Sequence, residues 1–251
     1  MVHIVGAGCG APDLITLRGS RLIGEADVII YAGSLVNPEL LKGAKECCSV
    51  YDSAKMTLEE MTETISQAEK DGKTTVRLHS GDPSLYGAIG EEMRELDRLG
   101  IEYDITPGVS SFSGAAAALK TEYTLPDVSQ TVIITRAAGK TPVPEKEDLR
   151  SLASHGATMV LFLSIGLLKK VTEELIAGGY SPDTPAAIVY KASWDDQKVC
   201  RCTVADLEET ARKNGITKTA LITVGAFLDS DFARSKLYDP GFATEFREAS
   251  N

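Results

Sequence analysis

The chain lacks the long apolar run that a membrane span requires, because none of its hydrophobic segments approaches ~18–20 residues. Its N-terminus also lacks a basic segment followed by an apolar stretch, so no signal peptide is expected. The five cysteines are odd in number and form no C-x-x-C motif, which argues against a disulfide framework or a zinc site. We therefore expect a cytoplasmic protein with no membrane contact and no bound metal.

Basic side chains are also scarce. The sequence has 26 Lys and Arg against 36 Asp and Glu, and its formal net charge is -10. Nucleic acid binding needs a basic face, so no nucleic acid partner is expected. A polyanionic small molecule would need a local cluster of Arg and Lys to overcome the overall repulsion. The motifs of serine hydrolases, P-loop enzymes and zinc proteases are all missing from the sequence.

Short apolar segments alternate with helical patterns along the first 120 residues of the chain. Thr57 begins a helix and is followed three residues later by Glu60, which together predict a capping box. A further helix is expected over residues 88–99, and Ser110 or Ser111 can cap another. This order predicts an α/β protein whose first domain has a parallel sheet covered on both faces.

The alternation lapses between Lys120 and Gln130, where we place a domain boundary. Apolar strands resume afterwards, and the runs that begin at Ile188 and Val199 are close enough to form a hairpin. The second sheet is therefore expected to be mixed. The predicted organisation is an N-terminal α/β domain at residues 1–120, a C-terminal α/β domain at residues 121–228, and a loosely held polar tail at residues 229–251.

Three glycine turns, each closing a short apolar strand, are the most informative feature of the sequence. They lie at Val5–Asp13, Ser80–Gly87 and Pro107–Ser111. In open α/β sheets, ligands bind outside the carboxyl ends of the strands. Glycine at those ends lets the backbone come close to a ligand. The three turns therefore predict one binding groove.

The first turn also fits the dinucleotide fingerprint G-x-G-x-x-[GA] between Gly6 and Ala11. Two features speak against a dinucleotide. Pro12 and Asp13 fall where the phosphate-binding helix should begin, and the second strand is not followed by an acidic residue that could hold a ribose. A tight turn without any ligand is a further alternative.

The other two turns each allow two interpretations. Gly81 and Asp82 form either an ordinary turn or a carboxylate and free amides that face a ligand. Ser110 and Ser111 either cap a helix or place hydroxyls and unpaired amides at a mildly positive helix N-terminus. His79 stands just before the second turn and is a candidate for a substrate-binding or supporting role.

Taken together, the three turns resemble the tetrapyrrole methylases, which transfer a methyl group from S-adenosylmethionine, mostly to carbons of uroporphyrinogen-derived rings. The resemblance extends from residue 2 to about residue 228. The segments Tyr31–Val36, Thr135–Glu145 and Leu161–Ser164 are similar to the precorrin-4 C11-methyltransferase branch of that family. Cys9 departs from the pattern, because the family usually has a proline there, and the first loop loses the fixed φ of proline.

The resemblance implies two α/β domains with a cleft between them, a homodimer, and S-adenosylmethionine as cofactor with S-adenosylhomocysteine as product. The implied reaction is methylation of carbon 11 of precorrin-4 or cobalt-precorrin-4 in cobalamin biosynthesis, and sequence does not tell whether the ring carries cobalt. Leu163 and Ala192 are expected to close the cofactor site from the second domain. The residues expected to bind the cofactor are Cys9, Ser80, Gly81, Asp82, Leu85, Ser110, Ser111, Leu163 and Ala192.

The acetate and propionate arms of such a substrate need cations, and Arg pairs bidentately with carboxylates. The candidate substrate-binding residues are Arg18, Arg136, Lys140, Lys191 and His79. Each charge has the alternative of being a solvated surface group, and no catalytic acid or base is identified. The alternative functions are methylation of uroporphyrinogen III or of carbon 2, 17 or 20, a dinucleotide-dependent oxidoreductase, and a non-catalytic binding module.

Overall fold

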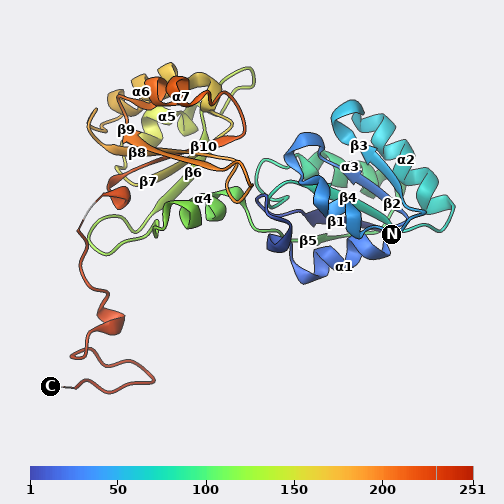
Figure 1. Cartoon of the computed structure of the whole chain (residues 1–251), viewed down its shortest axis with the longest axis horizontal. Helices are drawn as coiled ribbons and strands as arrows, with labels where there is room; N and C mark the ends of the chain where they lie inside the picture. The colour runs from blue at the N-terminus through green and yellow to red at the C-terminus, as the bar shows by residue number, and fades with distance from the viewer. Residues whose placement is uncertain (230, 251) are drawn as a thin grey trace. The chain divides into compact units, whose positions relative to one another are not determined.

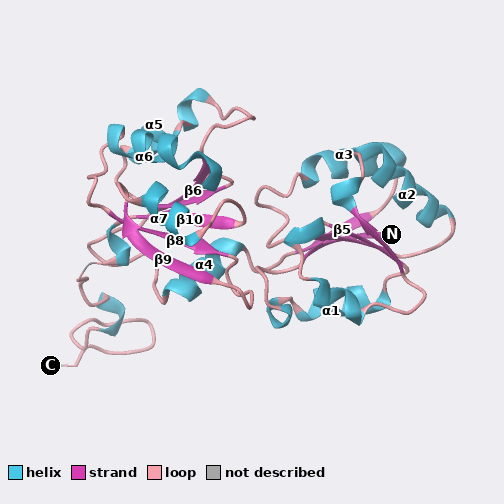
Figure 2. Ribbon diagram, turned by 45° about the horizontal axis from the view of Figure 1, so that its top comes forward, coloured by secondary structure: helices cyan, strands magenta, loops and turns pink. Residues whose placement is uncertain are grey.

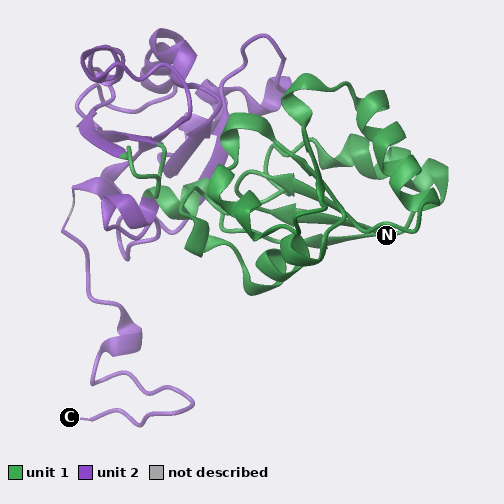
Figure 3. Cartoon of the chain, turned by 45° about the vertical axis from the view of Figure 1, so that its right-hand side comes forward, with its two compact units in different colours: residues 1–115, 191–197 green, residues 116–190, 198–251 purple. Residues whose placement is uncertain are grey.

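The computed structural model describes residues 1–229 and 231–250, and the chain divides into two compact α/β units (Figure 3). Unit 1 comprises residues 1–115 and 191–197, and unit 2 comprises residues 116–190 and 198–251. The division falls inside helix α4 (Ser111–Leu119). A short segment from the second half of the chain therefore belongs to the unit that the first half builds.

Within the described residues, unit 1 contains a parallel sheet with the strand order β3-β2-β4-β1-β5 (Figure 1). The parallel pairing confirms the prediction, and it follows from the connections that carry the chain back between strands. All five carboxyl ends therefore share one edge of the sheet. The strands are β1 (Val2–Gly6), β2 (Val28–Tyr31), β3 (Ser49–Asp52), β4 (Thr75–His79) and β5 (Tyr103–Thr106).

Helices cover both faces of this sheet (Figure 2). Helix α1 (Leu17–Glu25) lies on one face, and α2 (Leu58–Lys70) and α3 (Ile89–Leu99) lie on the other. The predicted capping box begins α2: the Thr57 Oγ1 accepts a hydrogen bond from the Glu60 N–H, and the Glu60 carboxylate accepts one from the Thr57 N–H. Such a cap typically contributes about 1 kcal/mol to helix stability.

Strand β3 was not predicted from the sequence. It is four residues long, lies at the sheet edge beside β2, and leaves Val50 44% and Tyr51 40% exposed. An edge strand of this length has no alternating apolar pattern to reveal it, because one side of its backbone has no partner strand.

Unit 2 contains a mixed sheet with the order β6-β7-β10-β8-β9 among the described residues. Strands β6 and β7 are parallel, whereas β8 and β9 form the predicted antiparallel hairpin. Buried residues such as Met159, Leu175 and Ile222 fill the core between this sheet and its helices. The elements are β6 (Val132–Arg136), β7 (Thr158–Phe162), β8 (Pro185–Tyr190), β9 (Lys198–Thr203), β10 (Ala220–Val224), α5 (Leu149–Ala153), α6 (Leu168–Ala177) and α7 (Leu207–Asn214).

The predicted tail at residues 229–251 includes Ser230 and Asn251, which lie outside the described residues. Its described part holds one short 3-10 turn at Lys236–Tyr238 and leaves Phe246 93% exposed. The Arg247 guanidinium donates to the carbonyl oxygens of Leu237, Asp239 and Phe242, which closes the segment on itself. In the part of the chain that the structure describes, no helix is both long and apolar enough to traverse a lipid bilayer.

Candidate cofactor site at the strand ends of unit 1

The first two glycine turns are joined by backbone hydrogen bonds beyond the end of the sheet. The Ala7 N–H donates to the His79 carbonyl at 2.7 Å. Gly8 and Gly81 exchange two bonds: the Gly81 N–H donates to the Gly8 carbonyl at 2.8 Å, and the Gly8 N–H donates to the Gly81 carbonyl at 3.2 Å. The two turns therefore continue the pairing of β1 with β4 and form one platform.

Asp82 ties the second turn to the third. Its Oδ2 accepts a hydrogen bond from the Gly108 N–H at 2.9 Å, and its Oδ1 accepts from the N–H and hydroxyl of Ser84. Burial raises the pKa of Asp82, but the hydrogen bonds from Ser84 and Gly108 outweigh burial and leave that pKa below its usual value. The carboxylate is ionised at neutral pH and acts as a staple between two loops.

The loops approach so closely that side chains are excluded. A Cβ on Gly108 would lie 2.2 Å from the Gly81 carbonyl oxygen, and a Cβ on Gly6 would lie 2.6 Å from the Gly108 nitrogen. At Gly81 the surroundings differ, because a Cβ there would sit 3.6 Å from the Ser111 nitrogen without a clash. Glycine at this position leaves room in front of the first amides of α4, which have no acceptor inside their own helix.

Residues 191–197 complete the platform from the loop between β8 and β9. The Ser193 Oγ accepts a hydrogen bond from the Ala11 N–H at 3.0 Å and lies 3.3 Å from the Cys9 sulfur. A Cβ on Gly10 would meet the Trp194 ring at 2.2 Å. The sequence assigns Ala192 to the second domain, but the structure groups it with unit 1, because this loop packs onto the first glycine turn.

The structure thus brings most of the predicted cofactor residues into one unit. Among these, Cys9, Ser110 and Ala192 are buried, whereas Ser80, Asp82, Leu85 and Ser111 are half-buried. Leu163 is the exception, because it follows β7 in unit 2. It is 69% exposed and has a φ of 52°, a left-handed conformation that is unfavourable for a leucine.

The five predicted substrate-binding residues lie in different settings. Arg18 and Lys140 are exposed, and among the described residues no hydrogen bond or ion pair engages their charged groups. Arg136 instead donates to the carbonyl oxygens of Thr141 and Pro142, which follow it in its own loop. Lys191 pairs with Asp196 at 2.7 Å and lies over the Trp194 ring.

His79 is 3% exposed, and its Nε2 lies 3.2 Å from the Glu92 carboxylate. Arg77, two residues earlier on β4, binds the same carboxylate. Sequence reasoning missed both Arg77 and Glu92. The available signal was an arginine inside an otherwise apolar strand, since a charged residue is seldom fully buried unless it is paired.

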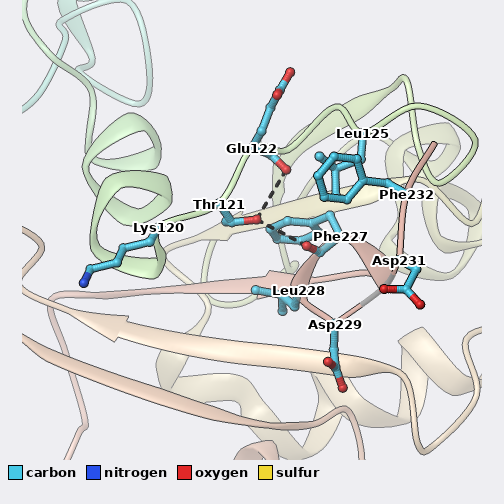
Figure 4. Close-up of a pocket in the computed structure, with 9 residues that line it drawn as sticks. All are labelled: Lys120, Thr121, Glu122, Leu125, Phe227, Leu228, Asp229, Asp231 and Phe232. Atoms are coloured by element: carbon cyan, nitrogen blue, oxygen red, sulfur yellow. Dashed lines mark hydrogen bonds between the residues drawn. The ribbon is translucent and has the colours of Figure 1, made fainter. Parts of the chain in front are cut away.

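A separate pocket of about 510 Å³ lies in unit 2, between the end of α4 and the start of the tail (Figure 4). The Thr121 hydroxyl donates there to the Phe227 carbonyl at 3.2 Å. None of the residues predicted from the sequence lines this pocket, and the described residues contain no group of three or more His, Cys, Asp and Glu placed to hold a metal.

The first turn does not have the geometry of a dinucleotide-binding motif. After Gly10 the chain forms a 3-10 turn at Pro12–Leu14, and α1 begins only at Leu17. In the dinucleotide fold, the glycine turn opens directly into the helix whose N-terminus holds the pyrophosphate. The intervening turn removes that helix end from the loop.

Comparison with known proteins identifies the family. The profile of the Tetrapyrrole (Corrin/Porphyrin) Methylases matches residues 1–208. The chain belongs to this family. It is 55% identical to the cobalt-precorrin-4 C(11)-methyltransferase of Methanocaldococcus jannaschii over 249 residues, which cover 99% of this chain and 96% of the relative.

Two solved structures extend the comparison. A cobalt precorrin-4 methyltransferase of cobalamin biosynthesis matches with a TM-score of 0.89 and 51% identity, over 91% of this chain and 96% of that one. A uroporphyrin-III C-methyltransferase from Thermus thermophilus, complexed with S-adenosylhomocysteine, matches with a TM-score of 0.74 and 27% identity, over 91% and 93%. Both confirm the tetrapyrrole methylase fold, and the protein is a methyltransferase.

Proposed function

We propose that the protein transfers a methyl group from S-adenosylmethionine to carbon 11 of cobalt-precorrin-4 in cobalamin biosynthesis. The observation that carries this proposal is the convergence of three glycine turns on one open platform, in a chain that is about half identical to cobalt-precorrin-4 methyltransferases over nearly all of its length. The cobalt form is favoured over metal-free precorrin-4 because the 55% identical relative and the 51% identical structure both carry that name.

The residues of the platform fit S-adenosylmethionine. Gly81 leaves space in front of the Ser111 amide, and the nearby hydroxyls of Ser80 and Ser110 supply polar groups of the kind that an adenosyl or amino acid moiety needs. Asp82 carries a negative charge beside this space. We infer that Cys9, Leu85 and Ala192 line the remainder of the site in unit 1, and that Leu163 contributes as the resemblance predicts.

When bound, S-adenosylmethionine supplies an electrophilic methyl group on a sulfonium. The protein then needs to hold the reacting atoms in line and ~3–3.5 Å apart, which is worth several kcal/mol of the barrier. The paired loops suit this task, because their backbones are joined by hydrogen bonds and have little freedom to shift. We assign no catalytic acid or base to any residue of this chain.

The carboxylate arms of the substrate would be bound by Arg18 first. Its guanidinium is exposed in the first turn of α1, close in sequence to the first glycine turn. Lys140 is an equally unengaged cation, whereas Arg136 and Lys191 already hold carbonyl and carboxylate oxygens of their own loops. An Arg18→Ala variant should therefore weaken tetrapyrrole binding while S-adenosylhomocysteine binding stays near normal.

One assay tests the function. The purified protein is incubated with carbon-13-labelled S-adenosylmethionine and either cobalt-precorrin-4 or precorrin-4, and the product is examined by carbon NMR. A label at carbon 11 with the cobalt substrate supports the proposal. Labelling at carbon 2, 17 or 20, turnover of uroporphyrinogen III instead, or turnover of metal-free precorrin-4 alone would each contradict it.

We infer further that the protein works as a homodimer in the cytoplasm, as the family resemblance implies. Light scattering coupled to size exclusion measures the mass directly. A mass of twice 26.8 kDa is expected, and a mass of 26.8 kDa across the working concentration range would contradict the dimer.

A further inference from the structure

A cluster of buried charges lies beneath the second glycine turn of unit 1. Glu92 on α3 accepts hydrogen bonds from Arg77 on β4 at 2.9 and 3.1 Å, and its other oxygen lies 3.2 Å from the His79 Nε2. Arg77 also donates to the carbonyl of Ile30 on β2. The three side chains are 6%, 8% and 3% exposed for Arg77, Glu92 and His79. We call these three residues the Glu92 cluster.

The Glu92 cluster joins the two ends of the loop at residues 80–88. Arg77 and His79 are two residues apart on one strand, so their side chains point to the same face of the sheet. The loop begins immediately after His79, and α3 begins immediately after the loop, with Glu92 at its fourth position. Glu92 therefore sets how far apart the start and the end of the loop can be.

The loop that is clamped in this way is strained. Tyr86 and Ala88 both have a φ of 55°, and a Cβ on Gly87 would lie 2.3 Å from the Pro83 carbonyl oxygen. No side chain among the described residues caps the first turn of α3. Strained residues persist only where the surrounding structure holds them, and the Glu92 cluster is a contact that spans the whole loop.

Stability alone is a weak reason to bury these charges. A buried ion pair often contributes no more than well-packed apolar side chains of similar volume, because its desolvation offsets the attraction. Apolar residues such as Met61, Ile65 and Leu96 already form the core on this side of the sheet. What a fork of directional hydrogen bonds adds is a fixed geometry between β4 and α3.

We propose that Arg77, His79 and Glu92 are positioning residues that hold the 80–88 loop in the conformation that binds the cofactor. They act through Ser80, Gly81, Asp82 and Leu85, and do not contact the cofactor themselves. The proposal rests on the proposed cofactor site and adds the device that shapes it.

The test compares Glu92→Gln with Glu91→Gln. Both variants remove one negative charge from the first turns of α3, but Glu91 is exposed and is not part of the cluster. Calorimetry should show S-adenosylhomocysteine binding at least tenfold weaker for Glu92→Gln and within twofold of the parent protein for Glu91→Gln. Equal affinities for Glu92→Gln and the parent protein would overturn the proposal.

Hydrogen exchange separates positioning from a general loss of stability. In Glu92→Gln, amides of the 80–88 loop should exchange at least tenfold faster, the Gly81 amide included, while amides of β10 in unit 2 exchange as in the parent protein. Uniform acceleration throughout the chain would mean a merely structural role. This readout needs no cofactor, so it tests the positioning proposal even if the parent protein binds no S-adenosylhomocysteine, an outcome that would contradict the proposed function instead.

A second pair of variants covers the case in which Glu92→Gln fails to fold. His79→Leu removes the bond to Glu92 but leaves the Arg77 ion pair, whereas His79→Gln places an amide donor near the former Nε2. We expect His79→Leu to weaken S-adenosylhomocysteine binding at least fivefold and His79→Gln to restore it to within twofold. Equal binding by both His79 variants would overturn the proposal.

Discussion

The two units bury different kinds of polar side chain. Unit 1 buries Arg77, His79 and Glu92, whereas the buried polar side chains of unit 2 among the described residues are all hydroxyls: Thr135, Thr158, Ser164 and Thr223. A hydroxyl meets local needs at low desolvation cost, as when Ser164 donates to the Phe162 carbonyl and accepts from the Ala137 N–H. Over the described part of the chain, buried charges are thus confined to the cluster beneath the 80–88 loop.

The sheets differ in a way that explains where the cofactor platform forms. All strands of unit 1 run in parallel, so their carboxyl ends and the loops that follow them meet at one edge. In unit 2 the antiparallel strands place carboxyl ends at both edges. Converging loops are therefore a property of unit 1, and unit 2 has the character of a scaffold with a conventional apolar core.

The largest expected effect comes from breaking that scaffold. Leu175 on α6 is fully buried, and Leu175→Ala should lower the free energy of unfolding by about 2–5 kcal/mol because it leaves a cavity. The neighbouring Ile176 is 37% exposed, so Ile176→Ala should have a clearly smaller effect. Denaturant titration measures both. Below the unfolding transition Leu175→Ala should still bind S-adenosylhomocysteine normally, and a tenfold loss of affinity would remove the distinction between the units.

A backbone contact should matter more for binding than for folding. Gly108→Ala places a methyl group against the Gly81 carbonyl, where only movement of one loop can make room. We expect at least a tenfold loss of S-adenosylhomocysteine affinity and about 1–3 kcal/mol of destabilisation. Gly166→Ala in unit 2 is the control, because its Cβ would meet no atom within 4 Å. Similar affinity for the two variants would contradict the close packing of the loops.

Acid should weaken unit 1 before unit 2. Burial raises the pKa of Glu92, but its hydrogen bond to His79 and the charge of Arg77 lower that pKa to below 4.5 overall. The stabilisation is thus fully present above pH 4.5 and is lost as the pH falls through the lowered pKa.

The single tryptophan, Trp194, belongs to unit 1 and reports on it by fluorescence, while circular dichroism reports on both units. On acidification the fluorescence change should precede the loss of circular dichroism. In Glu92→Gln the two should move closer together, because the variant lacks the titrating carboxylate. Coincident transitions in the parent protein would contradict this order.

The smallest expected effect tests the strain in the 80–88 loop. Ala88 has a left-handed backbone, which costs an alanine about 1 kcal/mol and costs glycine almost nothing. Ala88→Gly should therefore be neutral or stabilising by up to about 1 kcal/mol, despite the greater freedom of glycine in the unfolded chain. Ala117→Gly, at an exposed position in α4, should destabilise by about 1 kcal/mol. Thermal unfolding distinguishes the opposite signs, and two equal losses would mean that Ala88 carries no strain.

The elements that local sequence controls were predicted well. The capping box of Thr57 and Glu60 and the hairpin of β8 and β9 were confirmed, as were the parallel first sheet and the mixed second sheet. Strand β3 was missed because an exposed edge of four residues carries little pattern. The dinucleotide fingerprint was a weak signal, and the 3-10 turn after Gly10 shows why spacing alone did not define the loop.

The candidate site was predicted in its loops and missed in its supports. Glycine at a strand end is visible in a sequence, so the convergence of three turns could be inferred from the residues alone. The bond of Asp82 to Gly108 spans 26 residues, and the contact of Cys9 with Ser193 spans 184. Neither pairing has a local pattern, and neither was predicted.

By itself, the sequence of this protein determined its strands, its helix caps, its glycine turns and the family to which it belongs, because each depends on residues that are neighbours in the chain. Tertiary structure alone decided that Arg77, His79 and Glu92 share one buried site and that residues 191–197 join unit 1. The physical reason is that burial and directional hydrogen bonding between distant segments depend on how complete layers pack. No single stretch of residues contains that information.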